Sequence, residues 1–175
     1  YGFFGKISDA SINLTKQFAI KNLTAEIKNL ADHDGKGIKI FFETGSIYDL
    51  ELAGTIINLK RARNEIKIDS LLRTKGKFNF SQIKKITSLF GLDISNFNEI
   101  NGTADLKTNI IFNLDNRFRI KNPSYSVEGD IPYIEIHTNE KRIIKNYLPE
   151  YDPNIILKNT NIKLVNFESN YKTEL

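Results

Sequence analysis

The two histidines are the residues of this chain most able to bind a metal ion. His33 lies between Asp32 and Asp34, and imidazole and carboxylate groups are common metal ligands. No second histidine is near His33 in the sequence, and the spacing fits no common metal motif, so we interpret this segment as a polar turn. His137 ends a strand-like stretch and is expected to contact solvent or a neighbouring strand. The sequence therefore predicts no metal site.

Patterns that carry catalysis are also missing. The ten glycines are scattered singly, so no phosphate-binding loop is predicted, and no serine lies in a nucleophile elbow. Carboxylates alternate with lysines, as they do on the polar face of a sheet. Cysteine is absent, which excludes disulfides and thiolate metal sites. We therefore predict that the protein is not an enzyme and has no catalytic residue and no cofactor.

Basic residues are spread along the chain, although the formal net charge is +4. A nucleic-acid-binding protein concentrates such residues on one element. The densest basic stretch, residues 60–63, has the sequence of a hairpin tip. Phe78, Phe112 and Phe118 fall on apolar faces without a basic cluster, which favours packing over base stacking. No nucleic-acid partner is predicted.

Alternation of apolar and polar residues is the main structural signal. It is clearest in residues 104–114, where Leu106, Ile110 and Phe112 fall on one face and polar residues on the other, with Ile111 the exception. Similar runs recur along the chain, separated by turn residues. This spacing favours hairpins, because parallel strands would need helical crossovers between them. We predict an all-β, mainly antiparallel sheet.

One short helix is predicted over residues 81–90. Ser81 can cap it by accepting a backbone N–H. Ile83 and Leu89 belong to an apolar stripe at helical spacing. Gly91 is placed to end the helix in a left-handed turn. We expect the helix to cover an end or an edge of the sheet.

Strands that open with glycine resemble the repeated β segments of the AsmA-like family of bacterial envelope proteins (TamB/YhdP type). The resemblance rests on residues 100–106, on the predicted helix that leads into them, and on residues 125–131, where the turn into a new strand recurs. It covers roughly residues 20–136. It implies a long, curved sheet folded into a groove, often called a β-taco.

The resemblance also implies a function and a location. AsmA-like proteins are anchored in the inner membrane of Gram-negative bacteria, cross the periplasm, and move glycerophospholipids toward the outer membrane. The chain is accordingly expected to be a lipid-binding segment in outer membrane biogenesis and cell envelope integrity. It would be periplasmic and attached to the inner membrane by a segment outside this chain. The family supplies no catalytic residues.

The apolar face of such a sheet must be buried against something. In an open groove the partner is a set of phospholipid acyl chains, and each buried CH₂ contributes about 0.8 kcal/mol. Two other structures fit the same alternation. One is a structural or adhesive β-sandwich whose apolar faces bury each other. The other is a β jelly roll of the lipopolysaccharide-transport kind.

The expected lipid-facing residues are the apolar members of the clearest strands. In a closed core the same residues would pack against one another. They are Leu23, Ala25, Ile27, Ile38, Ile40, Leu50, Leu52, Ile57, Ile66, Ile68, Leu106, Ile110, Phe112, Phe118, Ile120, Ile134 and Ile136.

Residues 1–175 are interpreted as a single β-rich segment of a longer protein, because the chain begins at Tyr1 and a strand array leaves two sheet edges. Unpaired edges recruit further strands, so the rest of the same chain is the expected partner at both edges. Residues 162–167 are predicted to form an edge strand whose neighbour lies beyond Leu175.

Overall fold

The computed structural model describes residues 3–13, 19–32, 35–61, 64–89, 94–117, 119–139, 147, 150 and 152–166. The strands are β1 (Phe4–Asn13), β2 (Ala19–Asp32), β3 (Gly35–Ile47), β4 (Leu50–Glu51), β5 (Ile56–Arg61), β6 (Glu65–Asn79), β7 (Phe97–Asp115), β8 (Ile120–Thr138) and β9 (Asn154–Asn166), and α1 spans Phe80–Leu89. These strands form one nine-stranded sheet in which neighbouring strands pair antiparallel. The predicted fold class, all-β with one short helix, is confirmed.

Strand order follows chain order, β1-β2-β3-β4-β6-β7-β8-β9, with β5 also lying between β3 and β6. β4 pairs with the end of β3, and β5 pairs with its beginning, so the two short strands share one position in the sheet. Thr55 joins them: its hydroxyl oxygen accepts the backbone N–H of Arg73 at 3.1 Å, and its carbonyl accepts the N–H of Phe42 at 2.9 Å. The interruption therefore leaves few backbone groups without a partner.

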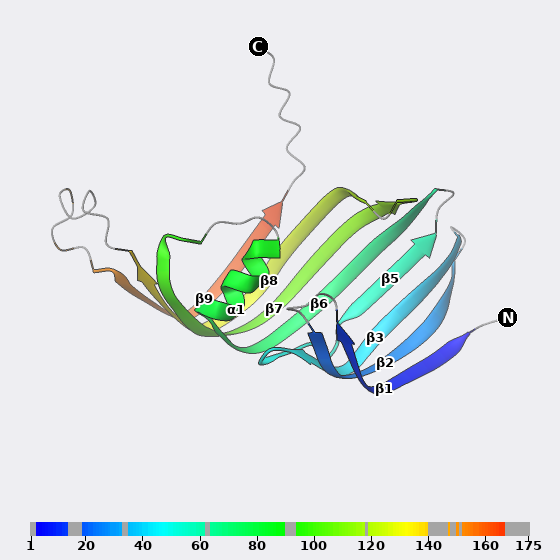
Figure 1. Cartoon of the computed structure of the whole chain (residues 1–175), viewed down its shortest axis with the longest axis horizontal. Helices are drawn as coiled ribbons and strands as arrows, with labels where there is room; N and C mark the ends of the chain where they lie inside the picture. Colours follow the sequence, from blue (N-terminus) through cyan, green and yellow to red (C-terminus); the bar gives the residue numbers. More distant parts are fainter. Residues whose placement is uncertain are drawn as a thin grey trace, which may run out of the picture.

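The sheet is strongly curved, and its long strands bend along their length (Figure 1). Two glycines of these strands have a conformation that L side chains rarely adopt, Gly76 at φ +145° and Gly129 at φ +149°. A Cβ at Gly76 would lie 2.4 Å from the carbonyl oxygen of Asp49, and one at Gly129 would lie 2.2 Å from that of Asp105. Only glycine permits these close backbone approaches.

Helix α1 starts one residue earlier than the sequence predicted, and its cap is Asn79 instead of Ser81. The Asn79 side chain accepts the Gln82 backbone N–H at 3.1 Å, and the Gln82 side chain accepts the Asn79 N–H at 3.0 Å. This reciprocal pair is a capping box, which satisfies two backbone donors together, whereas a cap at Ser81 would satisfy one. The predicted stop at Gly91 lies outside the described residues.

A small apolar core joins β2, β3 and the segment between β4 and β5. We call Ile20, Leu23, Ala25, Phe42 and Leu52 the packed cluster; all are buried, and Leu23 and Ala25 are 1% and 0% exposed. Ala10, Ile40, Ile47 and Ile57 pack against it.

The two edges of the sheet are β1 and β9. The predicted edge strand at residues 162–167 is part of β9, which begins earlier, at Asn154; Phe167 lies outside the described residues. β9 pairs with β8 from Asn154 to Asn166 and has no second partner among the described strands.

Candidate functional site

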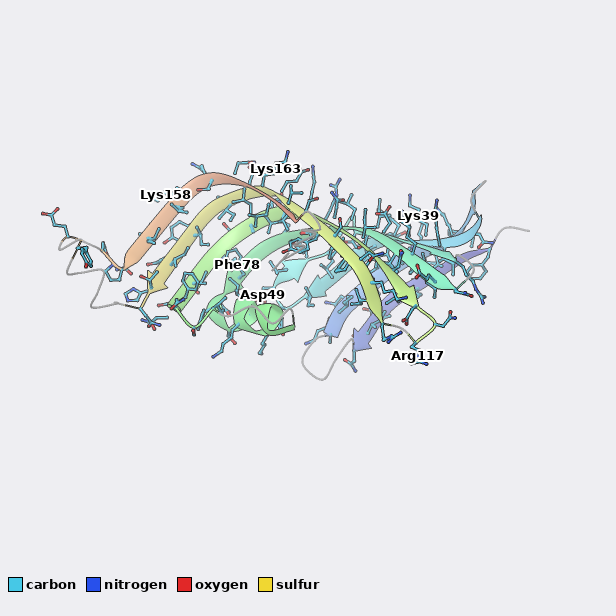
Figure 2. The ribbon with its side chains drawn as sticks, turned by 90° about the horizontal axis from the view of Figure 1, so that it is seen from above. Lys39, Asp49, Phe78, Arg117, Lys158 and Lys163 are labelled. Atoms are coloured by element: carbon cyan, nitrogen blue, oxygen red, sulfur yellow. The ribbon has the colours of Figure 1, made fainter. Side chains whose placement is uncertain are left out.

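The register of the strands sorts their side chains into two faces, because directly paired residues lie on the same face. One row runs from β2 to β8 and is almost entirely apolar: Ile27, Ile40, Ile57, Ser70, Ile110 and Tyr125. We call this side the inner face. A second inner row contains Phe78, Gly102, Ile134 and Leu157, and Phe78 lies on the concave side of the sheet (Figure 2).

Most of the residues predicted to face lipid lie together on the inner face. They are Leu23, Ala25, Ile27, Ile38, Ile40, Leu50, Ile57, Ile66, Ile68, Leu106, Ile110, Phe112, Ile120, Ile134 and Ile136. Leu52 belongs to no strand and packs in the cluster of β2 and β3 instead. Phe118 lies outside the described residues.

The opposite, outer face is mainly polar. Lys39, Lys158 and Lys163 lie on the convex side of the arch (Figure 2). Ion pairs link neighbouring strands there: Lys6 with Glu43 at 2.8 Å and, farther along the sheet, Lys75 with Asp105 at 3.0 Å. Ile111, the exception to the alternation, is on this face and is 36% exposed, since its partners are Asp69 and Ser124.

The inner face is buried at the packed cluster and more exposed on β8 and β9, although Ile38 on the inner face of β3 is itself 40% exposed. The packed cluster fills the end at β2 and β3. On β8 and β9, five large apolar residues of the inner face are exposed: Ile120 62%, Tyr125 46%, Ile155 37%, Leu157 42% and Leu164 59%. We call these five the open surface. Contiguous exposed apolar side chains usually mark a binding surface.

The sequence prediction identified only Ile120 among the residues of the open surface. The other four, Tyr125, Ile155, Leu157 and Leu164, were missed because their strands show only short alternating stretches next to turn-rich sequence. The signal was present in two places: Tyr125 and Val127 flank Ser126, and Ile162 and Leu164 flank Lys163. Pairing with the inner residues of β7 and β8 assigns these side chains to their face.

A cavity of about 410 Å³ lies beside the first turn of α1. Gln82 is 8% exposed, and its side-chain nitrogen donates to the Asp49 carboxylate at 3.0 Å. This bond ties α1 to the turn before β4. The cavity is lined by Asp49, Lys77, Phe78, Asn79, Gln82, Asn101, Gly102, Thr103 and Tyr133.

The clearest electrostatic perturbation among the described residues is at Asp115. The backbone N–H and side chain of Arg119, with the N–H of Arg117, lower the pKa of Asp115 from 3.8 to about 2. A hydrogen bond to Glu135 raises the pKa of Tyr133. Within the described part of the chain, no group of three or more His, Cys, Asp or Glu side chains could hold a metal ion. Among the same residues, no helix combines the length and the apolar character needed to cross a membrane.

Comparison with known proteins gives no relative. No family model, no curated protein and no solved structure matches the chain.

Proposed function

We propose that this chain binds lipid acyl chains along its inner face, as a segment of a longer protein that carries glycerophospholipids between membranes. The observation that carries the proposal is the exposure of the open surface, above all of Ile120 and Leu164 at 62% and 59%. Apolar area of this kind gains about 25 cal/mol for each Å² that is covered. Acyl chains can cover a concave strip of strands without a second sheet.

The arrangement of the sheet favours lipid over the two alternative folds. A β-sandwich or a jelly roll buries one apolar sheet face against another. The described strands form one sheet, and no second sheet lies across its inner face. The rows of apolar residues run across successive strands, so that a bound acyl chain could stay in contact with apolar side chains along the groove.

The AsmA-like resemblance supplies the setting of the proposal. Lipid transport across the periplasm of a Gram-negative bacterium needs a path that shields acyl chains from water. A sheet that is apolar inside and charged outside provides such a path. In this proposal the membrane attachment belongs to parts of the protein outside this chain, and the chain itself performs no catalysis.

Ile110 and Ile111 allow a matched test, because they are consecutive residues on opposite faces of β7. The probe is a phosphatidylethanolamine with a fluorescent acyl chain, titrated into the 175-residue chain. Ile110→Asp should weaken binding about tenfold or more, because a carboxylate beside acyl chains is costly. Ile111→Asp should leave binding within about twofold of the unmodified chain, since its side chain contacts solvent.

Folding is checked by circular dichroism for each variant. If Ile110→Asp does not fold, Ile120→Asp replaces it, because that side chain is already 62% exposed. Equal binding by the inner-face and outer-face variants would contradict the proposal, as would no binding by the unmodified chain.

Transport is tested separately from binding. Donor vesicles that contain the quenched fluorescent lipid are mixed with unlabelled acceptor vesicles. The chain should accelerate the gain of fluorescence, and the inner-face variant should not. If the chain binds lipid but does not accelerate the gain of fluorescence, it is a lipid-binding protein and the proposed carrier role is rejected.

A further inference from the structure

The outer edge of β9, which pairs with no other described strand, is unusual among sheet edges. It is 13 residues long, contains no proline and pairs with β8 without a register shift. Natural edge strands are usually blunted by shortness, proline, bulges or inward-pointing charges. The only backbone irregularity in β9 is Asn159, at φ +50°.

The other edge, β1, is blunted. Its register with β2 shifts twice, between Ile7 and Ala10 and between Ala10 and Ile12, and Asp9 has a φ of +51°. Such bulges interrupt the row of backbone donors and acceptors that an added strand would need. β9 offers the more continuous row.

The distribution of apolar side chains on β9 is also typical of an interior strand. Apolar residues occupy both of its faces: Leu157 and Leu164 are on the inner face, and Ile156 and Val165 are on the outer face, 52% and 46% exposed. A strand designed to remain at an edge would place charged groups at several of these positions.

The charges of β9 select the kind of partner. Lys158 and Lys163 are its only charged residues, and both lie on the outer face opposite Tyr133 and Glu128 of β8. A second copy paired through β9 would gather four lysines with no carboxylate from either β9. Like charges across strands are destabilising, and opposite charges contribute roughly 0.2–1 kcal/mol for each pair.

We propose that β9 is a docking edge for an extended, acidic strand of a partner, which adds antiparallel to the sheet by main-chain hydrogen bonding. The partner strand carries carboxylates opposite Lys158 and Lys163 and apolar residues on the inner face. Its backbone supplies affinity, and its carboxylates supply specificity and register. This inference does not depend on lipid binding.

Synthetic peptides of about 13 residues test the proposal, because they match the length of β9. The acidic peptide carries glutamates opposite the two lysines, which are five residues apart, and apolar residues opposite the inner-face positions of β9; a matched peptide has lysines in place of the glutamates. The acidic peptide should bind about tenfold or more tightly, by fluorescence anisotropy, and shift the amide resonances of residues 154–166. An acidic peptide that is N-methylated at alternate residues should not bind, since it cannot complete the ladder.

A variant with one lysine of β9 reversed in charge tests whether these lysines determine the peptide preference. Lys158→Glu should abolish the preference for the acidic peptide, because one lysine and one glutamate then remain on β9; this position avoids Glu128, which faces Lys163. Lys77→Glu is the control, because Lys77 lies in the same outer row on the interior strand β6 and should change nothing.

Three results would overturn the inference. The first is no peptide binding. The second is binding that ignores peptide charge and N-methylation. The third is a dimer of the chain formed through β9, which sedimentation at high concentration would detect and which would make a second copy the occupant.

Discussion

The packed cluster and the open surface lie on the same face of one sheet, and both are made of aliphatic and aromatic side chains. Leu23 in the cluster is 1% exposed, whereas Leu164 on the open surface is 59% exposed. At the packed end, the segment that joins β4 to β5 brings Leu52 against β2 and β3. At the open side, β8 and β9 have no such covering segment in the described part of the chain.

Alternation therefore predicts which face a residue is on but not what covers it. Whether an apolar residue is buried depends on segments distant in sequence, such as the one that brings Leu52 into the same cluster as Leu23. In this sheet, the same sequence pattern stabilises the fold at one end and leaves an apolar surface at the other. Substitutions at the two ends should consequently affect different measurements.

The largest effect is expected at the packed cluster. Phe42 is 5% exposed, so Phe42→Ala should lower the free energy of unfolding by about 3–5 kcal/mol, because it leaves a cavity. Urea denaturation measures the change. Leu164→Ala is the comparison and should cost about 0.5 kcal/mol or less, since its side chain already contacts solvent. Equal losses at the two sites would remove the distinction between the two ends.

A smaller loss of stability is expected at Gly129, on a strand that carries part of the open surface. Gly129→Ala should destabilise by roughly 1–3 kcal/mol, because the residue has a φ of +149° and its Cβ would meet the Asp105 carbonyl. The melting temperature reports this cost. Ser126→Ala on the same strand is the control and should change it little. If Gly129→Ala had the melting temperature of the unmodified chain, glycine would not be required at this position.

The helix between the two ends gives a third comparison. Asn79→Ala should cost about 1 kcal/mol of stability, because it removes the side-chain acceptor of the capping box. Ser81→Ala should cost about 0.5 kcal/mol or less, since Ser81 is exposed. Chemical denaturation of both variants distinguishes the two caps. A larger loss of stability in Ser81→Ala than in Asn79→Ala would indicate that Ser81 caps the helix, as the sequence predicted.

The smallest effect concerns acid stability next to the open surface, at the turn before Ile120. The folded state holds the pKa of Asp115 at about 2, below its ordinary value of 3.8. The stability that this carboxylate contributes is therefore complete above about pH 4 and is lost as the pH falls from 3.8 toward 2. Asp115→Asn should flatten the dependence of the urea midpoint on pH in this range. An identical dependence in the variant would show that Asp115 does not titrate with folding.

The sheet was predictable because its signal is local. Period-two alternation in residues 104–114 requires only that one face be dry, and pairing places Leu106, Ile110 and Phe112 on that face. The position of Leu52 was not predictable, since it depends on β4 and β5 sharing one place in the sheet. The cap was misassigned because Asn79 is both the last residue of β6 and the start of the helix signal, and only the hydrogen bonds with Gln82 separate these roles.

The pairing of each strand with its neighbours in the sequence has a kinetic consequence. A sheet assembled in chain order adds each new strand to one already in place, so the entropy lost at each pairing is smaller than if strands distant in the chain had to find each other. No pairing joins the first described strand to the last one. The sheet can therefore form progressively from its N-terminal hairpin as the chain emerges during synthesis, and each completed strand serves as the template for the strand that follows it.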